Sequence, residues 1–270
     1  MSDADKVFDG SIPELYDTYL VPLIFEPYAA DLAKRLSSRT PFAVLEIAAG
    51  TGVVTRAMAS VLSESVSIVA TDLNQAMLDH ARAVGTKRTV EWRQADATDL
   101  PFRAGAFDAV ACQFGVMFFP DKAQAFSEAR RVLRPGGVLI FNVWDRIIEN
   151  EFADTVTTAL ESMFPKDPPR FLARTPYGYH DRPTIERDLA NGGFTKSAQI
   201  ATVAARSRAQ SPHLPAIAYC QGTPLRNEIE TRDPARLGEA TAIAAKAIAQ
   251  RFGQGAVDGK IQALVVTIEN

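Results

Sequence analysis

The sequence has few of the residues on which disulfide frameworks, metal sites and membrane spans depend. It holds two cysteines and three histidines in 270 residues, so it shows neither a disulfide framework nor a spacing typical of metal ligands. No apolar stretch approaches the roughly 18 residues of a membrane span. The first residues, from Met1 to Lys6, lack the basic start and apolar run of a signal peptide. We therefore predict a cytoplasmic protein with no bound metal and no membrane span.

The chain also has no excess of basic residues. The chain has 29 Lys and Arg against 32 Asp and Glu, for a formal net charge of -3. Proteins that bind nucleic acids usually carry a basic patch or stripe, whereas the cluster of Arg130, Arg131 and Arg134 fits the solvated end of a helix. Nucleic acid is therefore not expected among the partners. The hydrophobic share of 47% is enough for one large core, or for one domain with a smaller cap.

The sequence does contain a strand, a loop of small residues and a helix in direct succession between residues 42 and 62. The apolar run 42–47 predicts a short strand that is buried on both faces. The following Ala-Ala-Gly-Thr-Gly loop, residues 48–52, lets a ligand approach the backbone closely. Apolar residues recur at helical spacing from Val53, and Thr51 is placed to cap that helix. Free N–H groups at such a helix start predict a site for a nucleotide-like ligand.

These residues resemble the first motif of the class I S-adenosylmethionine-dependent methyltransferases, which is an acidic residue, an apolar one and then G-x-G-x-G. An ordinary dinucleotide loop would need G-x-G-x-x-G, and no third glycine follows here at that spacing. The acid before the loop favours the ammonium group of a methionine moiety over a pyrophosphate. The resemblance implies S-adenosyl-L-methionine as the cofactor, bound at Glu46, Ala48, Gly50, Thr51 and Gly52, with Ala48 in place of the family's first glycine.

A second strand, predicted over 66–71, ends in Asp72, 20 residues after Gly52. An acid at the tip of this strand can accept hydrogen bonds from ribose hydroxyls. The alternative is that Asp72 caps the next predicted helix, 74–84. Leu73 and Met77 would then offer apolar surface to the adenine.

After a third predicted strand, 89–93, residues 96–102 read D-A-T-D-L-P-F and resemble the family's D-A-x-x-L-P-F motif. The resemblance implies that Asp96 accepts from the adenine amino group, with Ala97 beside it. A fourth strand, 107–114, brings Gln113 to the edge of the sheet where ligands bind in this fold class. The N-P-P-Y or D-P-P-Y segment of the family's amino-methylating DNA and RNA enzymes is absent at this strand end.

The later segments complete the predicted architecture. We expect helices over 121–133, 149–164 and 184–190, and a proline-rich loop over 165–183. An L-R-P-G-G turn (133–137) leads into a fifth strand, 138–144. The last two strands cover 194–204 and 260–268, on either side of an insert, 211–252, with an Ala-rich helix.

The resemblance, to the branch that includes ubiquinone and menaquinone biosynthesis methyltransferases, implies a doubly wound α/β fold. Its mostly parallel seven-stranded sheet has the order 3-2-1-4-5-7-6, with strand 7 antiparallel. We assign residues 1–270 to a single methyltransferase domain with a core near 41–145, 194–204 and 260–268, and with helical cap elements over 1–40, 146–185 and 205–255.

The function predicted from this resemblance is S-adenosylmethionine-dependent methyl transfer to a small organic acceptor. Tyr16 is expected at the methionine end of the cofactor, Tyr19, Tyr177 and Gln221 at the acceptor, and His180 as the single candidate for a general base. Plain packing is the alternative for each of these. Two other functions stay open: an NAD(P)-dependent oxidoreductase of the Rossmann type, which the loop and the lack of a Tyr-x-x-x-Lys pair disfavour, and a non-catalytic cofactor-binding protein.

Overall fold

The computed structural model describes residues 12–270, so the prediction made on Met1 to Lys6 lies outside the described residues. By their contacts the described residues form two compact units. Unit 1 comprises the chain up to Phe25, Trp144–Gly178 and Ala204–Ala263, and unit 2 comprises Glu26–Val143, Tyr179–Val203 and Leu264–Asn270.

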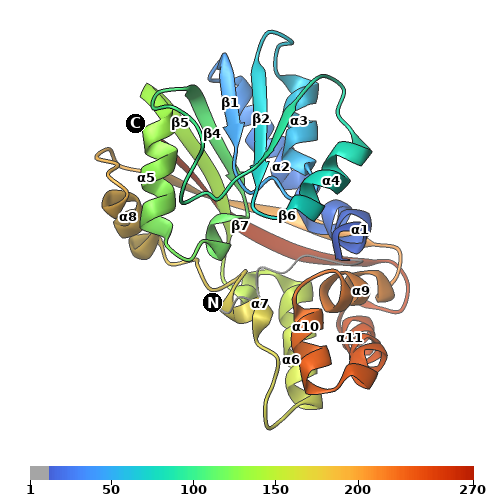
Figure 1. Cartoon of the computed structure of the whole chain (residues 1–270). Coiled ribbons are helices and arrows are strands. Elements are labelled where there is room, and N and C mark those ends of the chain that lie inside the picture. Colours follow the sequence, from blue (N-terminus) through green and yellow to red (C-terminus); the bar gives the residue numbers. More distant parts are fainter. Residues whose placement is uncertain (1–11) are drawn as a thin grey trace. The chain divides into compact units, whose positions relative to one another are not determined.

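A seven-stranded sheet has the order β3-β2-β1-β4-β5-β7-β6, and β1 to β5 pair in parallel (Figure 1). The fold class predicted from the sequence, with its antiparallel seventh strand, is confirmed. The strands are β1 (Ala43–Glu46), β2 (Ser67–Asp72), β3 (Glu91–Gln94), β4 (Phe107–Gln113), β5 (Leu133–Trp144), β6 (Gln199–Ala209) and β7 (Val257–Glu269).

Unit 2 has helices on both faces of its strands. The helices are α2 (Glu26–Ser37), α3 (Val53–Val61), α4 (Gln75–Val84), η3 (Val116–Phe118), α5 (Lys122–Val132) and α8 (Arg182–Asn191). Side chains alternate along β5: Ile140 belongs to the core formed with α2 and α3, whereas the Phe141 ring lies 5.3 Å from the Phe126 ring of α5. Because successive strand residues point to opposite faces, the core around Ile140 and the packing of Phe141 against α5 lie on opposite sides of the sheet. The strands β1 and β4, which are apolar except for Glu46, Asp108 and Gln113, are buried between these two layers, as this arrangement requires.

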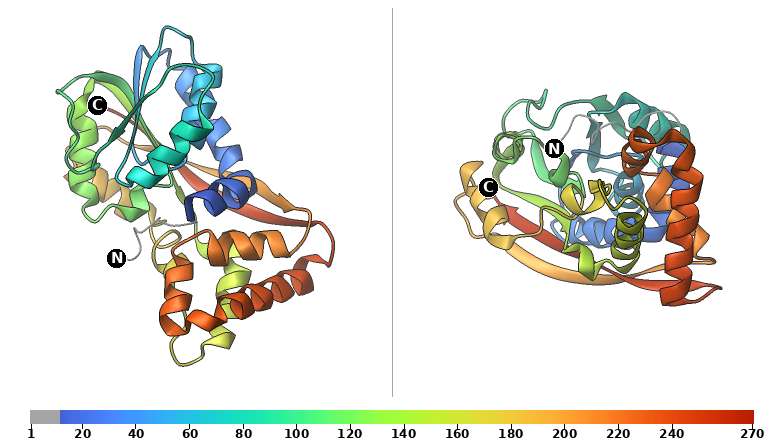
Figure 2. Two further views of the ribbon diagram at one scale, coloured as in Figure 1. Left: turned by 45° about the vertical axis from the view of Figure 1, so that its right-hand side comes forward. Right: turned by 90° about the horizontal axis from the view of Figure 1, so that it is seen from below.

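Unit 1 is mainly helical. Figure 2 shows α6, α9 and α11 gathered together, and ring contacts at 5.0 to 6.0 Å connect Tyr16, Phe25, Trp144 and Tyr177 in a chain. The segment η2 is a ten-residue π-helix that contains Pro22. The helices are α1 (Ile12–Leu15), η2 (Tyr16–Phe25), η4 (Ile147–Glu149), α6 (Glu151–Met163), α7 (Phe171–Arg174), α9 (His213–Gln221), α10 (Leu225–Arg232), η5 (Pro234–Arg236) and α11 (Leu237–Phe252).

Some local predictions need correction. The sixth strand runs from Gln199 to Ala209 rather than over 194–204, because Gly193 has φ of 89° and the chain becomes extended only at Gln199. The Arg-Pro-Gly-Gly segment, 134–137, is part of β5 and not a separate turn. There the irregularity between Phe107 and Ala109 of β4, together with φ of 75° at Gly136, absorbs the bend. The predicted loop 165–183 contains α7, and the insert contains α9 and α10 before its Ala-rich helix.

Candidate functional site

The loop between β1 and α3 alternates left-handed with ordinary backbone. Ala48, Gly50 and Gly52 have φ of 54°, 56° and 84°. This path turns the N–H of Ala49 toward the carbonyl oxygen of Thr71 at 2.9 Å, and the N–H of Gly50 toward the Asp72 Oδ2 at 2.8 Å. The loop is therefore fixed to the end of β2 at two points.

The two glycines of this loop have different surroundings. A β-carbon on Gly50 would meet no atom within 4 Å, whereas one on Gly52 would lie 2.8 Å from the Trp92 ring and 3.2 Å from the Ala81 β-carbon. Gly52 therefore allows α3 to pack closely against its neighbours. Gly50 borders open space, which is the arrangement that a ligand against the backbone needs.

Thr51 does not cap α3, so this prediction is wrong. The N-cap residue is Gly52, which has no side-chain hydrogen bond, and the Thr51 hydroxyl is buried with no partner among the described residues. The N-cap lies one residue later than predicted, because Gly52 adopts the left-handed conformation directly before α3. Instead, the Arg56 guanidinium donates to the Thr51 carbonyl oxygen at 2.6 Å and closes the loop from the helix side.

Asp72 lies at the tip of β2, 7% exposed, with both carboxylate oxygens in use. Oδ2 accepts from the Gly50 N–H and Oδ1 from the Asn74 N–H, each at 2.8 Å. Burial raises the pKa of this carboxyl, and the backbone donors at Asn74 and Gly50 oppose that rise. The N-cap of α4 is Asn74, so the alternative in which Asp72 caps this helix is not what the structure shows. Each oxygen still has a lone pair for a further donor.

Glu46, the acid before the loop, is 1% exposed. Its Oε2 accepts from the Thr55 hydroxyl of α3 at 2.5 Å, while the Thr71 hydroxyl donates to the Glu46 carbonyl oxygen at 3.0 Å. Burial raises the pKa of Glu46 to about 8, and the Thr55 hydrogen bond opposes this. At neutral pH the Glu46 side chain therefore carries a proton most of the time. For Asp72, in contrast, the two backbone N–H donors favour the charged carboxylate.

The other predicted cofactor residues surround the same strand ends. Leu73 is an apolar side chain with 48% exposure, whereas Met77 of α4 is buried at 4%. Asp96 is exposed. Its Oδ1 accepts from the N–H and the hydroxyl of Thr98, and these two hydrogen bonds shape a turn around Ala97, which is buried.

The end of β4 contains strained backbone. Phe114 has φ of 51°, which is rare for a bulky residue. Its N–H donates to the Oδ1 of the wholly buried Asn142 at 2.9 Å, and its ring meets the Tyr28 ring edge-on at 5.3 Å. Asn142 also donates to Gln113 at 3.4 Å, so one buried amide orients both residues at this strand end.

Gly115 follows this strained residue and lies directly against the loop. A β-carbon on Gly115 would be 2.5 Å from the Ala48 β-carbon and 2.8 Å from the Cys112 Sγ. The side chain that Ala48 has in place of the family's first glycine therefore occupies the space that Gly115 leaves open.

The residues predicted at the acceptor divide between the two units. In unit 1, Tyr16 stacks on Phe25 at 5.0 Å, Tyr177 is buried against Trp144, and Gln221 donates to the Thr241 hydroxyl at 3.0 Å. Tyr19, also in unit 1, lines a cavity.

His180 lies in unit 2 and is half-buried. Its neighbour Tyr179 donates to Asp188 at 2.9 Å, and its neighbour Asp181 caps α8. The structure therefore places His180 beside a fixed helix start.

Sequence reasoning missed the supporting residues Thr55, Phe114 and Asn142. A polar residue within the apolar run V-L-I-F-N-V-W was a usable signal for Asn142, because a buried amide needs partners. Nothing in the sequence pattern indicates that Phe114 adopts a left-handed conformation.

Within residues 12–270, no group of three or more His, Cys, Asp or Glu side chains could hold a metal ion. No helix in that range is both long and apolar enough to cross a membrane.

Comparison with known proteins gives this geometry a family context. Residues 45–141, from β1 into β5, match the family described as "Methyltransferase domain". These residues are thus similar to a methyltransferase domain. The resemblance predicted from the motifs is confirmed, and the oxidoreductase alternative is not favoured.

The chain is also similar to proteins of known name. The chain is 30% identical over 164 residues to the ubiquinone/menaquinone biosynthesis C-methyltransferase UbiE of Escherichia coli, which covers 56% of this chain and 65% of that protein. The chain thus spans about 65% of the length of the curated relatives that it matches.

Solved structures share the fold at low sequence identity. The YcgJ protein of Bacillus subtilis matches with a TM-score of 0.58 at 16% identity, over 90% of this chain and 98% of that one. A phosphoethanolamine N-methyltransferase 2 of Haemonchus contortus, solved with S-adenosyl-L-methionine, matches with a TM-score of 0.59 at 15% identity, over 99% of this chain and 60% of that one.

Proposed function

We propose that this protein transfers the methyl group of S-adenosyl-L-methionine to a small organic acceptor. The observation that carries the proposal is the open space beside Gly50, in a loop that Asp72 fixes to the tip of β2. The methyltransferase domain match over residues 45–141 supports the same reaction class.

The residues of this edge fit the cofactor in size and charge. The free lone pairs of Asp72 suit the ribose hydroxyls, and Glu46 would lose its proton beside the ammonium group of the methionine moiety, because a nearby cation favours the charged carboxyl. The exposed Leu73 side chain would cover one face of the adenine, and Asp96 with Ala97 would meet its edge. Gln113 at the end of β4 would contribute at the methionine end.

When bound, the cofactor supplies an activated methyl group on a positively charged sulfur. The protein's task is then mainly to align acceptor and donor and to exclude water, and positioning of this kind can contribute about 7–11 kcal/mol. Asn142 supports this by fixing Gln113 and Phe114, and the Ala48–Gly115 contact fixes the loop against the same strand end. His180 is the candidate for moving a proton if the acceptor must lose one, and Tyr19, Tyr177 and Gln221 remain the candidates for acceptor contacts.

Substitution at Gly50 tests the cofactor site. Asparagine tolerates a left-handed backbone, so Gly50→Asn should fold and should fill the open space, abolishing the binding of S-adenosylhomocysteine in equilibrium dialysis. Gly136→Asn is the control, since Gly136 also has positive φ, of 75°, and open space around it, but lies in β5. Retained binding in a folded Gly50→Asn would refute the site.

A second experiment distinguishes the enzyme from a protein that only binds the cofactor. The protein is incubated with methyl-labelled S-adenosylmethionine and a small-molecule cell extract, and S-adenosylhomocysteine is followed by mass spectrometry. We expect its formation to depend on the extract and to disappear with Gly50→Asn. Tight cofactor binding without turnover on extracts from varied sources would favour the binding protein.

A further inference from the structure

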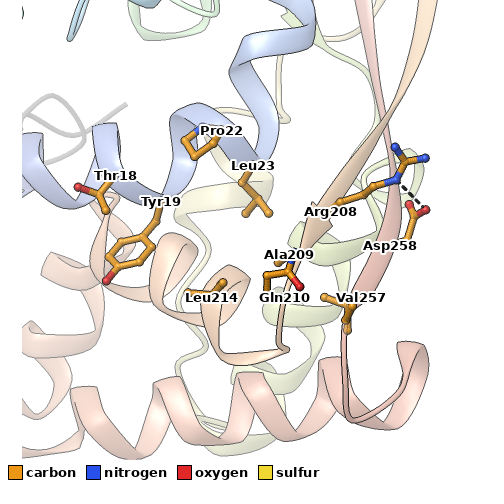
Figure 3. A pocket seen from close by; sticks show the side chains of 11 residues that line it. Thr18, Tyr19, Pro22, Leu23, Arg208, Ala209, Gln210, Leu214, Val257 and Asp258 are labelled. Atoms are coloured by element: carbon orange, nitrogen blue, oxygen red, sulfur yellow. Dashed lines mark hydrogen bonds and ion pairs between the residues drawn. The ribbon is translucent and has the colours of Figure 1, made fainter.

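A cavity of about 500 Å³ lies within unit 1, and none of the residues discussed for the cofactor edge of unit 2 lines it. Four segments form its wall: η2, the end of β6 with the residue after it, the start of α9 and the start of β7 (Figure 3). Its volume is in the range of about 300–1,000 Å³ that is usual for small-molecule sites. The lining residues are Thr18, Tyr19, Pro22, Leu23, Arg208, Ala209, Gln210, Leu214, Ala256, Val257 and Asp258.

One wall of the cavity is a π-helix. Helices of this type are rare, usually last a single turn and occur often at functional sites, whereas η2 has ten π-helical residues. Leu20, Ile24 and Phe25 on this helix are buried, and Phe25 is stacked on Tyr16 and packed beside Trp144. The wall is therefore held by aromatic packing behind it, while Pro22 and Thr18 remain exposed.

The middle of the cavity is apolar apart from Gln210, which lies beside Ala209, and its two ends are polar. Figure 3 shows Leu23, Ala209 and Leu214 between the Tyr19 ring and the pair formed by Arg208 and Asp258. Neither the Tyr19 hydroxyl nor the Gln210 amide has a partner among the described residues, so both can bond a ligand. An occupant would thus bury an apolar body and place polar groups at its ends.

The charged end carries an arginine whose side chain is 71% exposed and therefore accessible to an anion. Arg208 donates through its Nε to Asp258 Oδ2 at 3.0 Å, and this contact fixes the plane of the guanidinium. Its terminal Nη1 and Nη2 have no partner within residues 12–270 and form the two-pronged donor that matches a carboxylate. Arg206 donates to the other oxygen of Asp258 at 2.6 Å, so two guanidinium groups share one carboxylate and a single positive charge is left over.

We propose that this cavity is a binding site for a small amphipathic carboxylate. The apolar body lies against Leu23 and Leu214, and the carboxylate is bound by the terminal nitrogens of Arg208. A single negative charge matches the one surplus positive charge, whereas a doubly charged phosphate would leave one negative charge uncompensated. The proposal concerns unit 1 alone and does not depend on the cofactor.

The test compares two probes of the same shape in the absence of cofactor. Biphenyl-4-carboxylate is titrated into the full chain by calorimetry, with the neutral biphenyl-4-methanol as its partner. We expect one carboxylate per chain and, for the alcohol, an affinity lower by about 10- to 100-fold, since a charge-assisted hydrogen bond is lost. Equal affinities for the two probes would overturn the assignment of a carboxylate.

Two variants isolate the arginine. Arg208→Gln and Arg206→Gln remove the same charge beside the same Asp258, but only Arg208 lines the cavity. We expect Arg208→Gln to reduce the affinity for the carboxylate to that for the alcohol, and Arg206→Gln to change it by less than about threefold, as distant charge alone would. Equal losses in both variants would contradict a direct contact.

A third variant tests the cavity itself. Leu214 is half-buried at its wall, so Leu214→Trp should fill it and abolish the binding of both probes, with folding confirmed by circular dichroism. Phe42→Trp, at a side chain that is 70% exposed in unit 2, is the control and should bind as the unaltered chain does. Binding that survives Leu214→Trp would place the probe elsewhere and refute the proposal.

Discussion

Burial of the Glu46 carboxyl gives the protein a titrating group in its core. The folded state holds this proton up to a pKa of about 8, against 4.5 for an ordinary glutamate, because desolvation disfavours the charged form. Between these two values the folded chain binds more protons than the unfolded chain. The free energy of unfolding therefore falls as pH rises through this window, and the contribution of Glu46 no longer changes above it.

This leads to a prediction for Glu46→Gln. Glutamine keeps an oxygen for the Thr55 hydroxyl but cannot ionise, so the fall in stability between about pH 5 and 8 should become shallower, by up to about 1.4 kcal/mol per pH unit. Urea denaturation of the ligand-free chain across this range measures the difference. Parallel pH profiles for the two proteins would show that Glu46 does not titrate in this window.

Asp72 combines structural and binding tasks. Asp72→Ala leaves the N–H groups of Gly50 and Asn74 without their acceptor, so we expect a loss of about 1–3 kcal/mol of stability for each buried group left unpaired. We also expect S-adenosylmethionine to bind roughly 10- to 100-fold more weakly. Thermal melting of the ligand-free variant together with calorimetry tests both effects. Unchanged affinity in the destabilised variant would leave Asp72 with only its structural task.

At the scale of elements, the loop after β1 and the end of β4 are in steric contact. Gly115→Ala should push a methyl group into Ala48 and Cys112, destabilise the chain by about 1–3 kcal/mol and displace the loop that carries Gly50. Ala48→Gly in the same chain removes the obstructing β-carbon, so the double variant should regain most of the stability and of the affinity for S-adenosylhomocysteine.

The control for this pair is Cys112→Ala combined with Gly115→Ala, which relieves the contact with sulfur but not the contact with the loop. We expect it to restore less cofactor affinity than Ala48→Gly does. If only the cysteine substitution rescues binding, the steric coupling between the loop and the strand end is wrong.

The segment before α8 carries the prediction on His180. Tyr179 and Asp181 are fixed on either side of it, so we expect His180→Ala to lower turnover by roughly tenfold or less, through looser positioning, where a general base would supply about 10²–10⁴-fold. Single-turnover methyl transfer at saturating cofactor, with an acceptor found in the extract assay, measures this. A loss above about 10³-fold with unchanged cofactor affinity would make His180 the base.

The elements that the sequence predicts well are those whose own residues determine their burial. The strands β1, β2 and β4, and the helices α4 and α5, lie within two residues of the expected ranges, because each is an apolar run or a clear helical period between polar residues. α9 depends on packing in unit 1, and the start of β6 depends on packing in unit 2; local sequence gives no guide to either. The hydrogen bonds of Asp72 to Gly50, like the left-handed Phe114, arise only when distant strands are brought together.

At the scale of the whole molecule, the net charge of -3 carries a prediction about partners. Non-specific binding of nucleic acids comes from neutralised phosphates, so we expect no shift of duplex DNA or RNA in an electrophoretic assay at physiological salt, with dissociation constants weaker than about 10⁻⁴ M. Salt-dependent binding in the micromolar range would contradict this and would point to a nucleic-acid acceptor.

The central claim is that the edge formed by the β1–α3 loop, Asp72 and the end of β4 binds S-adenosylmethionine. Calorimetric titration of the full chain with S-adenosylmethionine, S-adenosylhomocysteine and NAD⁺ tests it most directly. The account predicts saturable binding of one molecule per chain for the first two ligands and no binding heat for NAD⁺. Saturable binding of NAD⁺, with none for either S-adenosyl compound, would contradict it.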